Sequence, residues 1–273
     1  MGAMGRSWQL LKQSFTVINA DVEILLFPVM SAVSALLVAA TFFVPMYKIG
    51  ALEAIHNGAG RWDDYAILFA WYYLNFFVVI FFNSALVACA NIRLSGGDPR
   101  VGDGLRTAAS RIHRIMAWAL VASTVGLLLQ SLQNRRNKLI GSLFASLLGL
   151  SWTLITYLIV PVIIFEDRSM FKSISRSAEL FKKNWGEQIA GGFGFGLLGF
   201  LLFLPGLALG ALCWSFDRGA AVIVAVVYLL VLSAVMSAAK GVFTVALYRY
   251  ATGGAAPPGF SADLIDGSLG GRR

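Results

Sequence analysis

The chain has 273 residues, of which 58% are hydrophobic and only 13% are charged, and its formal net charge is +8. Soluble domains carry about 25% charged residues, and a soluble globule of this length has too little interior to cover so much apolar surface. The composition therefore excludes an ordinary soluble fold. The positive charge is typical of the loops of a membrane protein, so we expect no nucleic-acid partner.

Six apolar blocks follow one another along the chain. A helix rises about 1.5 Å per residue, so roughly 20 residues cover the ~30 Å hydrocarbon core of a bilayer. Lipid offers no hydrogen-bond partner to the backbone of an open strand, so we predict an all-α membrane protein. We expect the first span to end at Pro45, and the third is the weakest because Gln130 and Gln133 dilute it. The predicted spans of this single domain, residues 1–273, are residues 24–44, 65–92, 115–133, 139–165, 189–214 and 221–239, followed by a cytoplasmic tail at residues 251–273.

The distribution of lysine and arginine favours six spans with both termini in the cytoplasm. Cytoplasmic loops of membrane proteins carry the excess of these residues. With Lys240 left out because it lies at the end of a span, six spans place 15 of them on the side of the N-terminus and 6 on the other side. Omission of the third span would leave 11 against 10. The basic cluster at residues 135–138 opposes this orientation, because six spans place it outside.

A basic amphipathic segment precedes the first, third and fifth predicted spans. In the last of these, one face holds Met170, Ile174, Ala178, Phe181 and Trp185, and the lysines and arginines lie off that face. Such a helix, joined to a span, is expected to lie in the headgroup layer with its cations toward anionic lipid. The candidate contacts with lipid headgroups are Arg6, Lys12, Arg106, Arg111, Arg114, Lys172, Arg176, Lys182 and Lys183.

These segments suggest an internal repeat of three units, each an interfacial helix followed by a transmembrane hairpin. The Ser-Gly-Gly sequence at residues 95–97, after the second span, resembles the Thr-Gly-Gly sequence at residues 252–254, after the sixth. The middle unit departs from the pattern, since it has Arg111 where the outer units have Leu11 and Phe181. The alternative is that any helix next to a membrane span shows this pattern.

Small residues at helical spacing predict close helix packing. Glycine and serine pairs four residues apart allow two membrane helices to approach closely, and we expect a seam between the fifth and sixth spans. The Gly-x-Gly-x-x-Gly pattern at residues 194–199 lies inside a span without a preceding strand, so it does not indicate a dinucleotide site. We expect Pro161 and Pro205 to kink their spans. The candidate helix-packing residues are Gly192, Gly196, Gly206, Gly210, Ser233, Ser237 and Gly241.

Few polar side chains lie at membrane depth. The candidate polar intramembrane positions are Asn75, Asn83 and Lys240, with Tyr72 and Tyr73 beside the first of them. The asparagines could line a pore, but hydrogen bonding between helices is their more common role. Lys240 follows the 19 uncharged residues of the predicted span 221–239, which favours a side chain that reaches the membrane surface over one in an ion pathway.

No arrangement of side chains predicts catalysis, a metal site or a cofactor. The two cysteines, Cys89 and Cys213, both lie in apolar blocks, where cysteine behaves as a small apolar residue. The acids and histidine at residues 53–64 match no known metal-ligand spacing. Four acids near the membrane surface could serve a lipid-modifying enzyme, but capping of helix starts explains them more simply. These acids are Asp98, Asp103, Glu166 and Asp167.

Two stretches of sequence resemble a known family. They are the end of the fourth span with the helix after it, from Val-Pro-Val-Ile-Ile-Phe-Glu-Asp at residues 160–167 to Asn-Trp-Gly-Glu at 184–187, and Ala-Leu-Tyr-Arg-Tyr-Ala-Thr-Gly-Gly at 246–254. The chain resembles the prokaryotic multi-helix membrane family catalogued as domain of unknown function 6159. It is more distantly similar to membrane domains found with some glycerophosphodiester phosphodiesterases, but we do not expect the activity of their soluble catalytic domain here. The resemblance implies a bacterial or archaeal cytoplasmic (inner) membrane and carries over no catalytic residues.

Two functions remain open. The first is a non-enzymatic membrane organiser that binds anionic lipid, a membrane protein partner or further copies of itself. It rests on the basic interfacial helices and the glycine seam. The alternative is an uncoupled channel or transporter for a small solute or ion, built as an oligomer around the polar residues of the second span. The first is favoured because the sequence shows no ion or substrate path.

Overall fold

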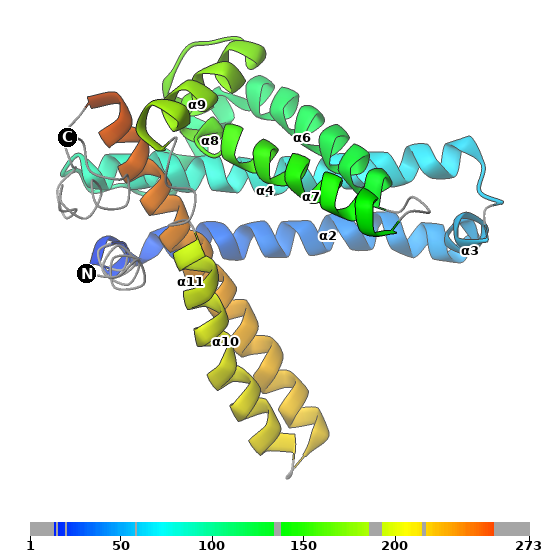
Figure 1. The fold of residues 1–273 in the computed structure, drawn as a ribbon. Helices are drawn as coiled ribbons and strands as arrows, with labels where there is room; N and C mark the ends of the chain where they lie inside the picture. Colours follow the sequence, from blue (N-terminus) through cyan, green and yellow to red (C-terminus); the bar gives the residue numbers. More distant parts are fainter. Residues whose placement is uncertain are drawn as a thin grey trace. The chain divides into compact units, whose positions relative to one another are not determined.

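Every regular element that the structure describes is a helix (Figure 1). The computed structural model describes residues 14, 16–19, 21–57, 59–133, 138–185, 193–214 and 217–253, with side chains omitted for residues 132–145, 183–198 and 213. The chain divides into two compact units, which are treated separately. The elements are η1 (Val22–Leu25), α2 (Leu26–Lys48), α3 (Ala51–His56), α4 (Trp62–Leu94), α5 (Val101–Ser110), α6 (Ile112–Gln133), α7 (Lys138–Ile155), α8 (Ile159–Phe165), α9 (Met170–Trp185), α10 (Phe193–Trp214) and α11 (Arg218–Gly253).

Five helical stretches among the described residues are long and apolar enough to cross a membrane, and they indicate a membrane protein. They coincide with five of the six predicted blocks. The remaining block corresponds to α10, a 22-residue helix that is apolar over Gly199–Leu212. The five candidate spans are Val22–Lys48, Trp62–Leu94, Ile112–Ser131, Ser146–Phe165 and Arg218–Gly253.

The first span does not end at Pro45, as we expected. Helix α2 continues to Lys48, and the carbonyl of Pro45 accepts a hydrogen bond from the N–H of Ile49 at 3.1 Å. A proline this close to the end of a helix removes a single intrahelical hydrogen bond, which the remaining apolar turns can offset. The chain then turns at Gly50, whose φ of 72° suits glycine.

In unit 1, which comprises Met1–Pro28, Leu86–Gly104 and Glu179–Arg273, the last third of α11 packs against the end of α4. A Cβ built on Gly241 would lie 2.3 Å from Cδ2 of Leu86, so the absence of a side chain at Gly241 makes room for Leu86. Farther along α11, Arg249 donates to the carbonyl of Asn91 at 3.3 Å and to Oγ of Ser95 at 2.6 Å. Gly241 therefore packs on the second span rather than contributing to a seam between the fifth and sixth.

Helices α10 and α11 lie side by side and form a hairpin within unit 1 (Figure 1). A Cβ on Gly206 would lie 2.3 Å from the ring of Tyr228, and the hydroxyl of Tyr228 donates to the carbonyl of Leu202 at 2.6 Å. Leu202 lies three residues before Pro205, whose missing N–H removes the helical partner of the Leu201 carbonyl rather than that of Leu202. The close approach at Gly206 thus brings a hydroxyl to the helical turn before the proline, and α10 continues through Pro205.

Unit 2, which comprises Val29–Ala85 and Leu105–Ala178, contains four apolar helices that meet through aromatic residues. Phe43 of α2 packs edge-on against Trp71 of α4, with ring centroids 4.7 Å apart. The hydroxyl of Tyr73 in α4 lies 3.5 Å from the carbonyl of Met116 in α6. Trp118 of α6 stacks on Trp152 of α7 at 5.7 Å. In this unit, therefore, α4 contacts α2 and α6, and α6 contacts α7.

The fourth predicted span is broken rather than continuous. Helix α7 ends at Ile155, residues 156–158 form a turn, and α8 begins at Ile159. Pro161 lies in the first turn of α8, where a missing N–H costs nothing. The backbone N–H of Leu158, freed by the break, donates to Oγ of Ser177 in α9 at 3.1 Å, in a buried position. A side chain from another helix therefore satisfies the backbone at the break.

Replacement of Ser177 by alanine is expected to destabilise the protein by about 1–3 kcal/mol, because it leaves the buried N–H of Leu158 without a partner. Ser173→Ala is the matched control. Ser173 is equally buried on α9, but its Oγ donates at 3.1 Å to the carbonyl of Ser169, which also accepts the backbone N–H of Ser173. Unfolding in mixed micelles of increasing SDS content measures both costs, and equal costs would contradict the role given to Ser177.

Replacement of Gly206 by alanine is expected to destabilise the α10–α11 hairpin by about 1–3 kcal/mol, because the ring of Tyr228 must move and lose its hydrogen bond. Gly210→Ala is the control, since its Cβ would lie at an ordinary 3.6 Å from Cβ of Ala225. The same SDS titration measures both. If the clash is the cause, Gly206→Ala should cost much less stability in a Tyr228→Ala background. If the costs of the two replacements simply add, the clash is not the cause.

Candidate functional site

The densest group of charges in unit 2 lies at the ends of two candidate spans. One span, Ser146–Phe165, is followed directly by residues 166–169, which lead into α9. The other, Ile112–Ser131, is preceded by Arg111 and carries Arg114 in its first turn. We refer to these residues as the charge cluster. Its members are Arg111, Arg114, Glu166, Asp167, Arg168, Lys172 and Arg176.

Asp167 connects the loop before α9 to the start of α6. Its carboxylate accepts a hydrogen bond from Nη1 of Arg111 at 3.2 Å and another from Nη2 of Arg114. Arg114 also donates through Nη1 to the carbonyl of Glu166 at 3.0 Å. Arg114 therefore holds the loop through both ends of its guanidinium, a geometry that lysine could not supply.

Glu166 is the more buried of the two carboxylates, with 15% of its side chain exposed. It accepts from Nε of Arg168 and, at 3.3 Å, from Nε of Arg176. Each carboxylate of the cluster is thus shared by two arginines, and five cationic side chains surround two anions. The sequence predicted helix capping for Glu166 and Asp167, and it did not single out Arg168. The arginine partners of Asp167 lie more than 50 residues away along the chain, so no local sequence pattern indicates them.

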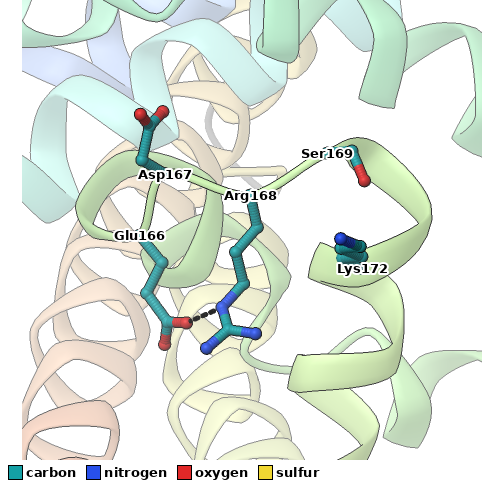
Figure 2. Close-up of a pocket in the computed structure, with 5 residues that line it drawn as sticks. All are labelled: Glu166, Asp167, Arg168, Ser169 and Lys172. Carbon is teal, nitrogen blue, oxygen red and sulfur yellow. Dashed lines mark hydrogen bonds and ion pairs between the residues drawn. The ribbon is translucent and has the colours of Figure 1, made fainter.

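Two hollows open beside these charges. The larger has a volume of about 560 Å³ and is lined by Glu166, Asp167, Arg168, Ser169 and Lys172. Figure 2 shows Arg168 paired with Glu166, Asp167 pointing away from that pair, and Ser169 close to Lys172. The smaller hollow, of about 340 Å³, is lined by His113, Arg114, Ala117, Asp167, Arg168, Ser169 and Met170.

The predicted headgroup contacts fall into three groups. Arg106, Lys172 and Lys182 are exposed. Arg111, Arg114 and Arg176 are partly buried and bound to the carboxylates of the cluster. Arg6, Lys12 and the side chain of Lys183 lie outside the described residues. Lys172 has no hydrogen-bond or ion-pair partner within the part of the chain that the structure describes.

The buried face of α9 differs from the apolar face expected from its sequence. Ser173, Ser177, Leu180 and Phe181 are buried, and of the expected residues only Phe181 is among them. Met170, Ile174 and Ala178 are half-buried, and the side chain of Trp185 lies outside the described residues. The hydroxyl of Ser177 explains the difference, because the freed N–H of Leu158 at the break between α7 and α8 needs an acceptor on this face.

The predicted polar positions lie in α4 and α11. The amide of Asn75 donates at 3.0 Å to the carbonyl of Trp71 in its own helix, and Asn83 is half-buried. Lys240 is exposed and lies 22 residues after Arg218 in the same helix, about 33 Å along its axis. That distance equals the thickness of a bilayer core, so a span that starts near Arg218 brings Lys240 to the opposite surface.

Only some of the predicted packing residues make close contacts with another helix. Gly206 meets Tyr228 and Gly210 meets Ala225, both between α10 and α11, and Gly241 meets Leu86. Ser233 and Ser237 are exposed on α11, and the Oγ of Ser233 donates to the carbonyl of Leu230 in the same helix. Gly196 lies in α10, and Gly192 lies outside the described residues.

Two acids of unit 1 cap the start of α5. The carboxylate of Asp103 accepts from the N–H of Arg100 at 3.0 Å, as the sequence analysis expected. Glu23, at the start of the first candidate span, accepts from the N–H of Val101 at 3.1 Å. Asp98 instead pairs with Arg93 at 3.4 Å. Among the described residues, no three His, Cys, Asp or Glu side chains come together as metal ligands.

Asp21, just before η1 in unit 1, is a buried carboxyl whose Oδ2 lacks a hydrogen-bond partner. Burial raises the pKa of Asp21 above its ordinary value of 3.8, and the nearby Arg93 guanidinium only partly opposes this rise. A carboxyl group whose pKa is raised in the folded state is harder to ionise there than in the unfolded chain. It therefore leaves stability unchanged below pH 3.8 and lowers the free energy of unfolding as the pH rises above that value.

Asp21→Asn is therefore expected to remove a pH dependence. The thermal midpoint of the wild type, relative to that of the variant, should fall as the pH is raised from below 3.8 toward neutrality. Thermal unfolding in detergent across this pH range measures the difference. A difference that stays constant with pH would show that Asp21 is equally ionised in the folded and unfolded chains.

Comparison with known proteins places the chain in a family. No curated protein and no solved structure matches it. The model of the family of unknown function DUF6159 matches residues 63–258, which include the charge cluster and every candidate span except the first. This is the family that the sequence resemblance indicated, and the match covers well over half of the chain. The chain belongs to the DUF6159 family.

Proposed function

We propose that the protein is a non-enzymatic organiser of a prokaryotic inner membrane, which binds anionic lipid and, through it, a membrane partner or further copies of itself. In this proposal six helices cross the bilayer as three hairpins, with both termini in the cytoplasm. Helix α10 supplies the sixth span, because its 22 residues extend about 33 Å and it pairs with α11.

The observation that carries this proposal is the position of the charge cluster. It lies where the candidate span Ser146–Phe165 ends and the span Ile112–Ser131 begins, which is the level of the headgroups on one membrane face. Five cations and two carboxylates leave a surplus of positive charge there. Each lysine or arginine near an anionic membrane surface contributes about 1 kcal/mol of attraction.

Helix α9 supports the same conclusion. Its buried side holds Ser173, Ser177 and Leu180, whereas Phe171, Lys172 and Lys182 are exposed. An exposed aromatic ring next to an exposed lysine suits the boundary between lipid tails and headgroups. The helix is thus tied to the protein on one side and free to contact lipid on the other.

The channel alternative rests on the polar residues of α4. Asn75 donates to its own helix and Tyr73 lies within hydrogen-bond distance of the carbonyl of Met116 in α6, so both have roles in helix structure. These contacts favour hydrogen bonding over a pore lining. A test therefore has to separate lipid binding from flux.

Native mass spectrometry of the protein, extracted gently with its surrounding lipid, tests the proposed function. We expect a stoichiometric anionic phospholipid on a monomer or dimer, with or without a protein partner. A closed symmetric oligomer that retains no anionic lipid would contradict the proposal and favour the channel.

The double variant Asn75→Leu, Asn83→Leu is the companion test. We expect it to retain lipid as the wild type does and to lose at most about 1 kcal/mol of stability, because the side chain of Asn75 bonds a carbonyl of its own helix and such polar contacts in membranes contribute little. Flux through proteoliposomes is the second measurement. Solute or ion flux in the wild type that the double variant abolishes would establish the channel instead.

A further inference from the structure

We infer that the larger hollow of the charge cluster, lined by Arg168, Ser169 and Lys172, binds the phosphate of an anionic glycerophospholipid. This inference rests on the proposed function and assigns its lipid to one site. The hollow is open to the surface, and its volume of about 560 Å³ leaves room for a phosphate group.

The donors that line the hollow are available for a ligand. Arg168 uses Nε to bind Glu166, and no described residue binds the two Nη atoms of its guanidinium. Ser169 supplies a hydroxyl, and Lys172 supplies an ammonium group with three donors. Neither side chain donates a hydrogen bond to another described residue. A planar guanidinium fork beside an ammonium group matches the oxygens of a phosphate.

The carboxylates of the hollow do not favour a cation. Glu166 and Asp167 each bind two arginines, so their negative charge is already neutralised within the protein. The remaining charge at the opening comes from Lys172 and from the surplus of the arginines. An anion lowers the electrostatic energy of this arrangement, whereas a metal ion would have to displace arginines from their carboxylates.

The location of the hollow favours a lipid as the source of the phosphate. Its first lining residue, Glu166, directly follows the candidate span that ends at Phe165. Phe171, which precedes Lys172 on the first turn of α9, is 82% exposed. A large apolar side chain next to the donors gives the acyl chains a surface to contact while the phosphate reaches Arg168 and Lys172.

The test uses the full-length protein in detergent and measures the affinity for phosphatidylglycerol, with phosphatidylcholine and free glycerol phosphate as the other two probes. The variants are Lys172→Gln, the double variant Arg168→Gln, Lys172→Gln, and the control Lys48→Gln. Lys48 is an exposed lysine at the end of α2, far in the sequence from the loop before α9. Its replacement by glutamine removes the same charge as Lys172→Gln does. Thermal midpoints verify that each variant folds.

We expect phosphatidylglycerol to bind the Lys172→Gln protein about tenfold more weakly than the wild type, and the double variant more weakly still, because each lost contact is charge-assisted. The Lys48→Gln protein should bind as the wild type does. Equal losses in Lys172→Gln and Lys48→Gln would overturn the inference in favour of diffuse attraction, and so would unchanged affinity in the double variant.

Two further outcomes separate this inference from the proposed function. If the wild type and the double variant bind phosphatidylglycerol equally tightly, the proposed site is wrong but lipid binding by the protein stands. A wild type that binds glycerol phosphate but neither lipid overturns the lipid source and, with it, the proposed function. Preference for phosphatidylglycerol over both other probes, lost in the double variant, supports both.

Discussion

A hydrocarbon layer offers no water to the backbone, so each N–H and carbonyl group within a span needs a partner from the protein itself. Among the described residues, a turn at 156–158 separates α7 from α8, whereas α10 passes through Pro205 without a break. At the turn, the N–H of Leu158 donates to Oγ of Ser177 in α9. A side chain of another helix therefore satisfies the freed backbone group, so the break and the contact between the helices depend on each other.

The contact at Leu158 has consequences for the charged loop that follows. Ser177 holds α9 against the start of α8, and only residues 166–169 connect the two helices, so the two carboxylates of this connection lie close to the helix ends. Asp167 then reaches Arg111 and Arg114, and Glu166 reaches Arg176. The hydrogen bond at Leu158 and the ion pairs of the loop thus act on the same pair of helices, α8 and α9.

Hydropathy alone predicted where the long helices lie, because lipid selects for apolar length and little else. It could not predict the break before α8, since Thr156, Tyr157 and Leu158 fit a helix as well as they fit a turn. Pro161, which was expected to kink this span, was the sequence signal near the break. It also placed the buried face of α9 on Ile174 and Ala178, whereas Ser173 and Ser177 are buried. Gly241 was recognisable as a packing residue, but its partner Leu86 lies 155 positions earlier, and no local pattern encodes such a contact.

The cations of the charge cluster divide by chemistry. Arginine presents a rigid fork that can bind a carboxylate and a carbonyl at once, and Arg114 does both. Lysine is a mobile point charge, and Lys172 stands exposed beside these bound arginines. Arginines that hold the loop would cost stability if they left it for a lipid, whereas Lys172 and the outer nitrogens of Arg168 can bind a ligand at no such cost. Lipid affinity should therefore follow Lys172 and Arg168, and the stability of the loop should follow Arg111, Arg114 and Arg176.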